Sequence, residues 1–358
     1  PEVRPTLLVS VPRLFEKVHT AILKSVAEGG AVTQHVFAWA VGVGTAVAAR
    51  RRAGKAPGVL LAAQHALAHR IVFATLHAKL GERVRFAVSG GAALPATVGA
   101  FFEAAGVLLI EGYGLSETAP VLAANPYAAP RVGTVGHVFP EVTLAIRDLH
   151  SGRIIGQLAG DAYPSTLTTG TGEILARGAS VMDGYWNKPE ATAEVFDADG
   201  WFRTGDVGRF EDGYLRITDR IKHMIVTLGG KNVYPGPIEE RLAASPLVDQ
   251  VVVLGEGREF LVALVVPEAD ALAAAAETGG WTVPGDPNAS PEAAALIEGV
   301  IREQARAAAS HEKVRSVRLV AEPFSVDNGL LTPTMKPKRA AIESRYADLI
   351  DEMYAVEA

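Results

Sequence analysis

The 358-residue sequence contains no cysteine. This absence excludes disulfide bonds, a catalytic thiolate and every metal site that depends on cysteine ligands. A chain without disulfides fits a reducing compartment, and we therefore expect a cytoplasmic location.

The sequence also lacks any dense run of positive charge. Its net charge is −6, and its one short basic cluster is Arg50-Arg51-Arg52, which we interpret as the solvated end of a helix. Domains that bind DNA or RNA usually carry an excess of Lys and Arg on one face. We therefore expect no nucleic-acid partner.

A long apolar run and a leader segment are missing as well. The most apolar early stretch, Val36 to Ala49, is too short to cross a bilayer. The first 30 residues lack the charged, apolar and cleavage segments of a signal peptide. The sequence opens on Pro1-Glu2-Val3 without a methionine, so we expect it to belong to a longer protein.

What is present is ample material for folded cores. Hydrophobic residues make up 49% of the sequence, and the length suits two or three domains. A predicted strand at Thr6–Val11 is followed by a helix from Pro12, and residues 31–80 have the pattern of two helices. Predicted strands at Val84–Ser89 and Val107–Ile110 enclose a glycine turn and a helix, an order that indicates a parallel pair.

After residue 132 the pattern changes to short alternating segments, which predict a mostly β subdomain over residues 133–219. A hairpin, further helices and a turn-rich cationic segment follow. The expected elements are strands at Val142–Ile146, Gly172–Arg177 and Leu215–Thr218, a hairpin of Val248–Leu254 and Phe260–Val266, helices around 268–278 and 291–309, and a strand at Val314–Val320.

Two groups of polar residues, far apart in the sequence, suit a nucleotide. Tyr113 stands in a Gly-Tyr-Gly turn, where a flat ring can stack on a base. Ser116 can hydrogen-bond a phosphate oxygen, and Glu117 suits Mg²⁺, which takes one or two carboxylates together with substrate phosphates. Asp206, in what we interpret as a turn flanked by glycines, can accept both hydrogen bonds of a ribose, and Arg220 offers a fork of donors. Taken alone, each group also fits a turn former, a core tyrosine or a surface ion pair.

Three histidines recur at helical spacing in an Ala-rich stretch, namely His65, His69 and His77. Imidazoles at such a spacing bind zinc when further ligands complete the set. No carboxylate stands nearby in the sequence, so we interpret them as ordinary surface or interhelix residues.

Taken in order, seven stretches are similar to the motifs of the adenylate-forming superfamily, which includes acyl- and aryl-CoA synthetases, adenylation domains and luciferases. Within it the sequence most resembles the long-chain fatty-acid–CoA ligases. The matching stretches are Val11–Lys17, Ser89–Leu94, Glu111–Thr118, Gly184–Trp186, Trp201–Gly208, Asp219–Glu239 and Leu330–Arg339.

The resemblance implies an α/β fold in two parts. Residues 1–219 would be the rear part of a large adenylate-forming domain, in which a parallel sheet with helices precedes the β subdomain. Residues 220–358 would be a small, mobile α+β C-terminal domain that turns about a hinge at Lys222.

It also implies a role for each matching site residue. Those that would bind the nucleotide are Gly90, Gly91 and Ala92 along the adenine, Tyr113 and Gly114 at its face, Ser116 at the α-phosphate, Glu117 at Mg²⁺, and Asp206 with Arg220 at the ribose. Gly229 and Gly230 would lie against the pantetheine arm of coenzyme A. Lys336 would be the catalytic lysine of adenylation, assisted by Ser116 and Glu117.

The implied activity is the ATP-dependent conversion of a fatty acid to acyl-AMP and then, with CoA, to acyl-CoA. Peripheral contact with the inner face of a membrane and a homodimer stay open, as do a ligase that serves a carrier protein and a nucleotide-binding module without catalysis. The Ser/Thr/Gly-rich phosphate loop of the family is absent from this sequence. We therefore expect the isolated chain to be inactive.

Overall fold

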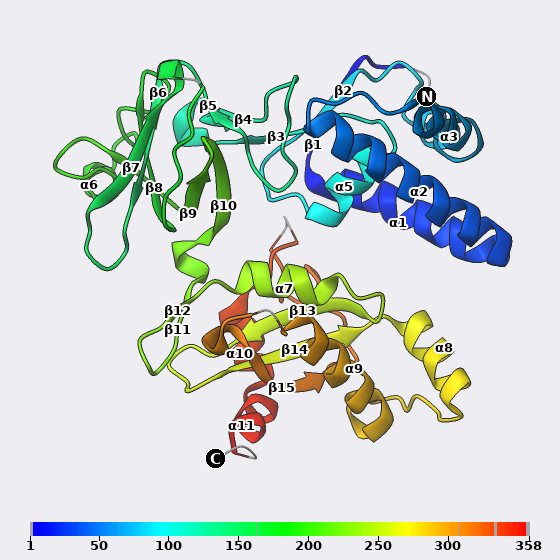
Figure 1. The fold of residues 1–358 in the computed structure, drawn as a ribbon. Helices are drawn as coiled ribbons and strands as arrows, with labels where there is room; N and C mark the ends of the chain where they lie inside the picture. Colours follow the sequence, from blue (N-terminus) through cyan, green and yellow to red (C-terminus); the bar gives the residue numbers. More distant parts are fainter. Residues whose placement is uncertain (1–2, 163, 307, 333–334, 356–358) are drawn as a thin grey trace. The chain divides into compact units, whose positions relative to one another are not determined.

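The computed structural model describes residues 3–162, 164–306, 308–332 and 335–355. The chain forms two compact units, Pro1–Ile217 and Thr218–Ala358 (Figure 1). Each unit has cores of its own, so each is described by itself.

The first unit begins with a five-stranded sheet in the order β1-β2-β3-β4-β5. The three strands that come first, β1, β2 and β3, run parallel, which confirms the parallel pair predicted from the sequence, and β4 and β5 continue the sheet antiparallel. The strands are β1 (Leu7–Ser10), β2 (Phe86–Ser89), β3 (Leu109–Tyr113), β4 (Ala123–Ala124) and β5 (His137–Val138).

Helices cover this sheet and share one apolar core with it. They are α1 (Pro12–Glu28), α2 (Gly30–Arg52), α3 (Val59–Ala68), the π-helical turn η1 (His69–Phe73), α4 (Ala74–Lys79) and α5 (Ala96–Ala104). Phe15, Phe73 and Phe102 are among the most deeply buried residues of the core. The backbones of α2 and α5 touch, because a Cβ on Gly44 would lie 2.1 Å from the Ala104 carbonyl oxygen.

The length argument against a membrane span is wrong. The apolar stretch Val36–Ala49 lies in a helix of 23 residues, Gly30–Arg52. This helix and the stretch Val59–Lys79 are both long and apolar enough to cross a bilayer. A buried core helix can have the same length and composition, so these two properties do not identify a membrane span. In this fold α2 buries Ala40, Val43 and Val47.

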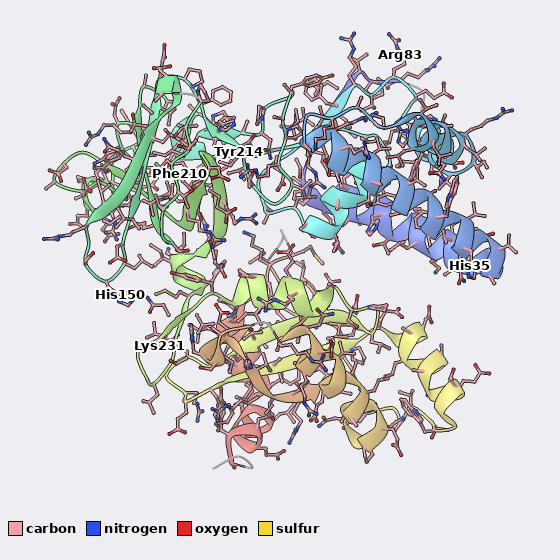
Figure 2. All side chains as sticks on the ribbon, viewed as in Figure 1. His35, Arg83, His150, Phe210, Tyr214 and Lys231 are labelled. Atoms are coloured by element: carbon pink, nitrogen blue, oxygen red, sulfur yellow. The ribbon has the colours of Figure 1, made fainter. Side chains whose placement is uncertain are left out.

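A second sheet of the first unit has the order β10-β9-β8-β6-β7. The three predicted strands lie in β6 (Val142–Arg147), β8 (Gly172–Gly178) and β10 (Tyr214–Arg220). The sequence interpretation did not include β7 (Ile154–Ala159) and β9 (Phe202–Glu211). Phe210, labelled in Figure 2, is fully buried in the core of this sheet. The short helical segments of this part are η2 (Ser116–Thr118), η3 (Gly160–Ala162) and α6 (Pro189–Val195).

The second unit is built on a three-stranded sheet, β13-β14-β15. The predicted hairpin is β13 (Val248–Leu254) with β14 (Leu261–Pro267), and β15 (Val314–Leu319) pairs parallel with β14. Alternate strand residues enter different cores, since Val253 packs in one and Val252 in the other. Both faces of the sheet are therefore buried, which explains the unbroken apolar runs of its strands.

Helices supply both of these cores. Ile238, Ile297 and Leu272 pack with one face, whereas Ile342 and Met353 pack with the other. The remaining elements are η4 (Ile221–His223), β11 (Ile225–Val226), β12 (Asn232–Val233), α7 (Pro235–Ala243), α8 (Ala269–Gly279), η5 (Pro287–Ala289), α9 (Pro291–Gln304), η6 (Ser310–Glu312), α10 (Arg339–Arg345) and α11 (Ala347–Ala355). These sheets with their helices confirm the predicted α/β class.

Candidate functional site

The glycine turn expected to line adenine follows the carboxyl end of β2. Gly90 lies beside the end of β3, because a Cβ on Gly90 would be 3.8 Å from the Gly112 carbonyl oxygen. Gly91 has a φ of +82°, a conformation that side chains with a Cβ rarely adopt. Ala92 follows in the same exposed turn. The two glycine motifs therefore lie at the carboxyl ends of neighbouring parallel strands, where ligands of such sheets bind.

Tyr113 is the last residue of β3, and Gly114 follows it. A Cβ on Gly114 would lie 1.6 Å from the Pro120 carbonyl oxygen. The chain folds back tightly here, since Leu122 donates its N–H to the Tyr113 carbonyl oxygen. Gly114 thus has a packing reason of its own, which is independent of any ligand.

Asp206 does not lie in the turn that we expected. It lies inside the ten-residue strand β9, and the register between β8 and β9 shifts next to it. The Thr204 hydroxyl donates to the Ile174 carbonyl oxygen at 2.7 Å and accepts from the Asp206 N–H at 3.1 Å, while Gly205 takes a φ of +69°. Such irregularities re-aim side chains at functional sites. The carboxylate is buried, with 6% of the residue exposed.

The structure brings Tyr113 and Asp206 together, although 93 residues separate them. The Tyr113 hydroxyl donates to Asp206 Oδ2 at 2.8 Å. The hydrogen bond fixes the phenol ring beside the carboxylate. The residues chosen for the base and for the ribose are therefore neighbours within the first unit.

Ser116 and Glu117 lie in η2, just beyond the Tyr113 turn. Ser116 is exposed and Glu117 is half-buried. Glu117 Oε1 accepts a hydrogen bond from the Tyr185 hydroxyl at 2.9 Å, and this bond raises the pKa of Tyr185. Met182 also donates its N–H to the Glu117 carbonyl oxygen. Tyr185 was given no role from the sequence; its place in the matching stretch Gly184–Trp186 was the one signal available.

The donor set at Glu117 fits magnesium. Among the described residues, no group of three or more His, Asp or Glu side chains could hold a metal ion by itself. Mg²⁺ needs no such group, because it commonly binds one or two carboxylates and completes its shell with water and substrate phosphates. A single carboxylate oriented by Tyr185, beside the turn expected to bind phosphate, suits this mode.

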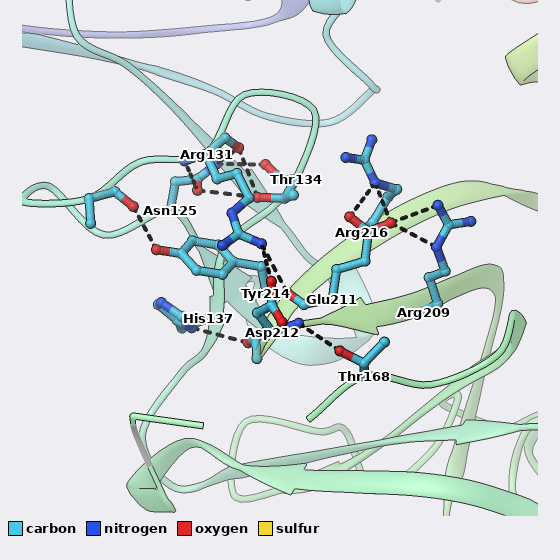
Figure 3. A network of polar contacts seen from close by, with 12 residues as sticks. Asn125, Arg131, Thr134, His137, Thr168, Arg209, Glu211, Asp212, Tyr214 and Arg216 are labelled. Carbon is cyan, nitrogen blue, oxygen red and sulfur yellow. Dashed lines mark hydrogen bonds and ion pairs between the residues drawn. The ribbon is translucent and has the colours of Figure 1, made fainter. Parts of the chain in front are cut away.

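A polar network that the sequence did not reveal holds the loop after β4 against the β9–β10 hairpin (Figure 3). The Arg131 guanidinium lies 4.1 Å from the centre of the Tyr214 ring and donates to the Glu211 carbonyl oxygen at 3.2 Å. The His137 ring also packs against Tyr214, with the ring centroids 4.1 Å apart and the planes tilted by 47°. The network ties β9, which carries Asp206, to the part of the chain that follows Tyr113.

Arg220 and Lys222 belong to the second unit. Arg220 ends β10, and Lys222 is exposed in η4. Near the end of the same strand, the Asp219 carboxylate accepts the N–H groups of Arg220 at 2.7 Å and Gly236 at 2.8 Å, and it lies 3.2 Å from His223 Nδ1. Asp219 thereby fixes the segment that contains the expected hinge.

Gly229 and Gly230 form an open turn between β11 and β12. Gly230 has a φ of +69°, and no atom lies within 4 Å of where a Cβ on either glycine would be. The turn is closed by the Thr227 and Lys231 backbones, which share a hydrogen bond of 3.1 Å. Its backbone is accessible to a ligand, and the contact with pantetheine stays a prediction.

Lys336 lies on a tight hairpin turn. Leu331 and Pro337 pair as an antiparallel bridge. Thr332 makes two hydrogen bonds with Lys336: its N–H donates to the Lys336 carbonyl oxygen at 2.8 Å, and its hydroxyl accepts the Lys336 N–H at 3.0 Å. Residues 333 and 334 of the matching stretch lie outside the described residues. The half-buried Lys336 is thus held by its own backbone.

Comparison with known families places these motifs in context. Residues 1–186 match the AMP-binding enzyme family, and residues 222–358 match the AMP-binding enzyme C-terminal domain. Long-chain-fatty-acid–CoA ligase FadD15 of Mycobacterium bovis is 40% identical over 99% of this chain and 55% of its own length. Human long-chain-fatty-acid–CoA ligase 1 is 32% identical over 98% of this chain and 48% of its own. The chain therefore spans about half the length of these curated relatives.

Solved structures agree with this assignment. The adenylation domain of carboxylic acid reductase from Segniliparus rugosus, solved with AMP and a co-purified carboxylic acid, has a TM-score of 0.67 and 26% identity, covering 99% of this chain and 48% of that one. ATP-bound MatB from Rhodopseudomonas palustris has a TM-score of 0.54 and 26% identity, covering 76% and 47%. With a family match over more than half of its length and a fold shared with AMP-bound adenylation domains, the chain belongs to the adenylate-forming AMP-binding enzymes.

Proposed function

We propose that this chain is part of a long-chain fatty acyl-CoA ligase. The observation that carries the proposal is the hydrogen bond between Tyr113 and Asp206, because it joins the base-binding and ribose-binding motifs in a family whose similar members are named as such ligases. A fatty carboxylate would attack the α-phosphorus of ATP and expel pyrophosphate. The CoA thiol would then attack the acyl carbon and expel AMP.

In the first unit, the described side chains would bind and orient the nucleotide. The Gly90–Ala92 turn and the Tyr113 ring would hold adenine, and Asp206 would accept the ribose hydroxyls, with Arg220 of the second unit assisting. Ser116 would hydrogen-bond the α-phosphate. Glu117, oriented by Tyr185, would hold Mg²⁺, which offsets charge on the phosphates when it is bound.

In the second unit, Lys336 would supply the cation that offsets the charge developing at the α-phosphate during adenylation. Thioester formation needs a different face of this unit, with Gly229-Gly230 along the pantetheine arm. A rotation at Lys222 between the two steps would allow one site to serve both half-reactions.

Lys336→Ala in the whole protein tests this proposal. The rate of adenylation, measured as the exchange of labelled pyrophosphate into ATP, should fall by about two orders of magnitude, equivalent to roughly 3 kcal/mol. Thioester formation from supplied acyl-AMP should persist, because Lys336 acts in the first step alone. Lys338→Ala is a matched control on an exposed neighbour. Equal loss in both half-reactions, or loss in neither, contradicts the role of Lys336.

The isolated chain is proposed to be inactive in the full reaction, since it lacks the loop that cradles the β- and γ-phosphates. Assays of acyl-CoA formation from ATP, CoA and palmitate should give product with the whole protein and none with residues 1–358. The proposed location is the cytoplasm, with peripheral contact at the inner face of the membrane, which fractionation would test.

A second candidate is a ligase that delivers the acyl group to a carrier protein. One relative, named long-chain-fatty-acid–[acyl-carrier-protein] ligase AEE15 of Arabidopsis thaliana, is 29% identical over 98% of this chain. Offering CoA and a pantetheinylated carrier protein in parallel distinguishes the two. Formation of acyl-AMP and pyrophosphate without a thioester on either acceptor would favour a ligase that stops at the adenylate. No nucleotide turnover would favour a binding module.

A further inference from the structure

Glu239 has a charged partner that the nucleotide site does not explain. It lies in α7, and its Oε1 accepts from the Arg339 guanidinium at 2.5 Å and from the Val253 N–H at 2.8 Å. Arg339 Nε also donates to the Val253 carbonyl oxygen at 3.4 Å. Both charged side chains are largely buried, with 15% and 17% exposed. The pair therefore joins α7 and the start of α10 to the carboxyl end of β13.

Arg339 lies three residues beyond Lys336. The intervening chain has no slack, because Lys338 donates its N–H to the Leu330 carbonyl oxygen at 2.8 Å and Pro337 pairs with Leu331. Leu330 and Leu331 are anchored in a core cluster. The Lys336 turn is thus held on both sides. Leu330 and Leu331 pack in the core before it, and the Arg339–Glu239 pair follows it.

Helix α7, which carries Glu239, is held at its first turn by Asp219. Gly236, the second residue of α7, donates its N–H to Asp219 Oδ2 at 2.8 Å. A continuous path of hydrogen bonds and helix therefore leads from Asp219 through α7 to Glu239, Arg339 and the Lys336 turn. All of these residues belong to the second unit.

We propose that Glu239 is a positioning residue for Lys336 and acts through Arg339. The inference rests on the proposed role of Lys336 in adenylation and adds the residue that sets where its ammonium group can reach. α7 makes the segment at residues 219–223 and the Lys336 turn one rigid piece. A rotation of the second unit would then bring Lys336 to a fixed position, because its loop cannot move independently of α7.

The competing explanation is a buried ion pair that serves stability alone. Burial raises the pKa of Glu239, and the Arg339 guanidinium is the largest influence that lowers it. Removing one partner of a buried pair is destabilising whether or not the pair has a catalytic consequence. Loss of total activity alone would therefore not separate the two explanations, but the two half-reactions do.

Glu239→Gln in the whole protein is the first test. The amide keeps an acceptor for the Val253 N–H and removes the charge that holds Arg339. Adenylation turnover should fall about tenfold to a hundredfold, as expected for a displaced catalytic group, with little change in the KM for ATP. Thioester formation from supplied acyl-AMP should stay within about twofold of the parent. In a Lys336→Ala background, Glu239→Gln should cause no further loss of adenylation, because the two residues act in series.

Stability effects are controlled in two ways. Glu239→Gln combined with Arg339→Met removes both charges, which buried pairs often tolerate, and should show the same split between half-reactions with melting close to the parent. Glu322→Gln breaks the exposed pair, 2.7 Å long, that Glu322 forms with Arg345 of α10, and should leave both half-reactions unchanged.

The outcomes separate this inference from the proposed function. If Lys336→Ala abolishes adenylation while the Glu239 variants retain it, Glu239 does not position Lys336 and the proposed function stands. If the folded double variant, Glu239→Gln with Arg339→Met, loses both half-reactions equally, the pair serves stability only and the inference is wrong. If Lys336→Ala has no effect on adenylation, the proposed role of Lys336 is wrong, and the inference about Glu239 falls with it.

Discussion

The hydroxyl of Tyr113 is a minor part of a residue chosen for its ring, yet its hydrogen bond to Asp206 joins the base and ribose motifs. Tyr113→Phe keeps the ring and leaves the buried Asp206 without this donor. We expect the KM for ATP in adenylation to rise about fivefold, equivalent to roughly 1 kcal/mol for one hydrogen bond. The measurement is pyrophosphate exchange over a range of ATP concentrations.

Tyr214→Phe is the matched control for that substitution. It also removes a tyrosine hydroxyl, which donates to the Ala129 carbonyl oxygen at 2.8 Å, and it keeps the ring that Arg131 and His137 contact. The KM for ATP should not change with it. An equal rise in both variants would show that Tyr113 acts through general stability.

At this scale the sequence identified residues whose chemistry is evident locally. Tyr113, Glu117 and Asp206 stand in short motifs with a side chain suited to each ligand group. Tyr185 and Glu239 were missed because their importance comes from partners 68 and 100 residues away. No local pattern indicates such a pairing.

Among the elements, the turn after β3 requires Gly114 because there is no room for a Cβ, and not because of its backbone angles. Gly114→Ala would place a Cβ against the Pro120 carbonyl oxygen, so we expect a loss of about 3 kcal/mol in the free energy of unfolding. Gly42→Ala is the control, since nothing lies within 4 Å of that position in α2 and alanine favours a helix by about 1 kcal/mol. Urea unfolding should show opposite signs; equal effects would contradict the packing argument.

The start of α7 should be sensitive to acid. Burial, the largest influence on Asp219, raises its pKa, but the hydrogen bonds from His223, Gly236 and Arg220 together lower it below its ordinary value. A carboxyl with a depressed folded pKa contributes stability above its unfolded pKa and loses it as the pH falls through the folded pKa. Melting of the second unit should therefore drop in that acid range. Asp219→Asn should flatten this dependence, and an unchanged acid limb would contradict it.

The element borders show where sequence patterns mislead. Thr204-Gly205-Asp206 has the composition of a turn, but the Thr204 hydroxyl replaces a ladder hydrogen bond and the strand continues past the irregularity as β9. The predicted hairpin of the second unit was found because its apolar runs are uninterrupted. Apolar patterning thus located the strands of the second-unit hairpin, whereas the turn-like composition around Thr204, whose hydroxyl bonds the Ile174 carbonyl oxygen, hid β9.

At the scale of the whole molecule, separate cores predict separate unfolding. Leu264 is fully buried in the second unit, and Leu264→Ala should cost about 2–5 kcal/mol there. Calorimetry of the chain should show two transitions, with one lowered by several degrees. Phe210→Leu, in the first unit, should lower the other. A common shift of both transitions would show that the units unfold together.

The division between the units falls inside β10, between Ile217 and Thr218. Asp219 is therefore part of a strand by its backbone and part of α7 by its side chain. The consequence concerns recombination between relatives. A crossover after Arg220 would give α7 an Asp219 inherited from a different parent, whereas a crossover before Thr218 transfers the helix with its own cap. Exchange of the second unit among family members should succeed most often as a block that begins ahead of Thr218.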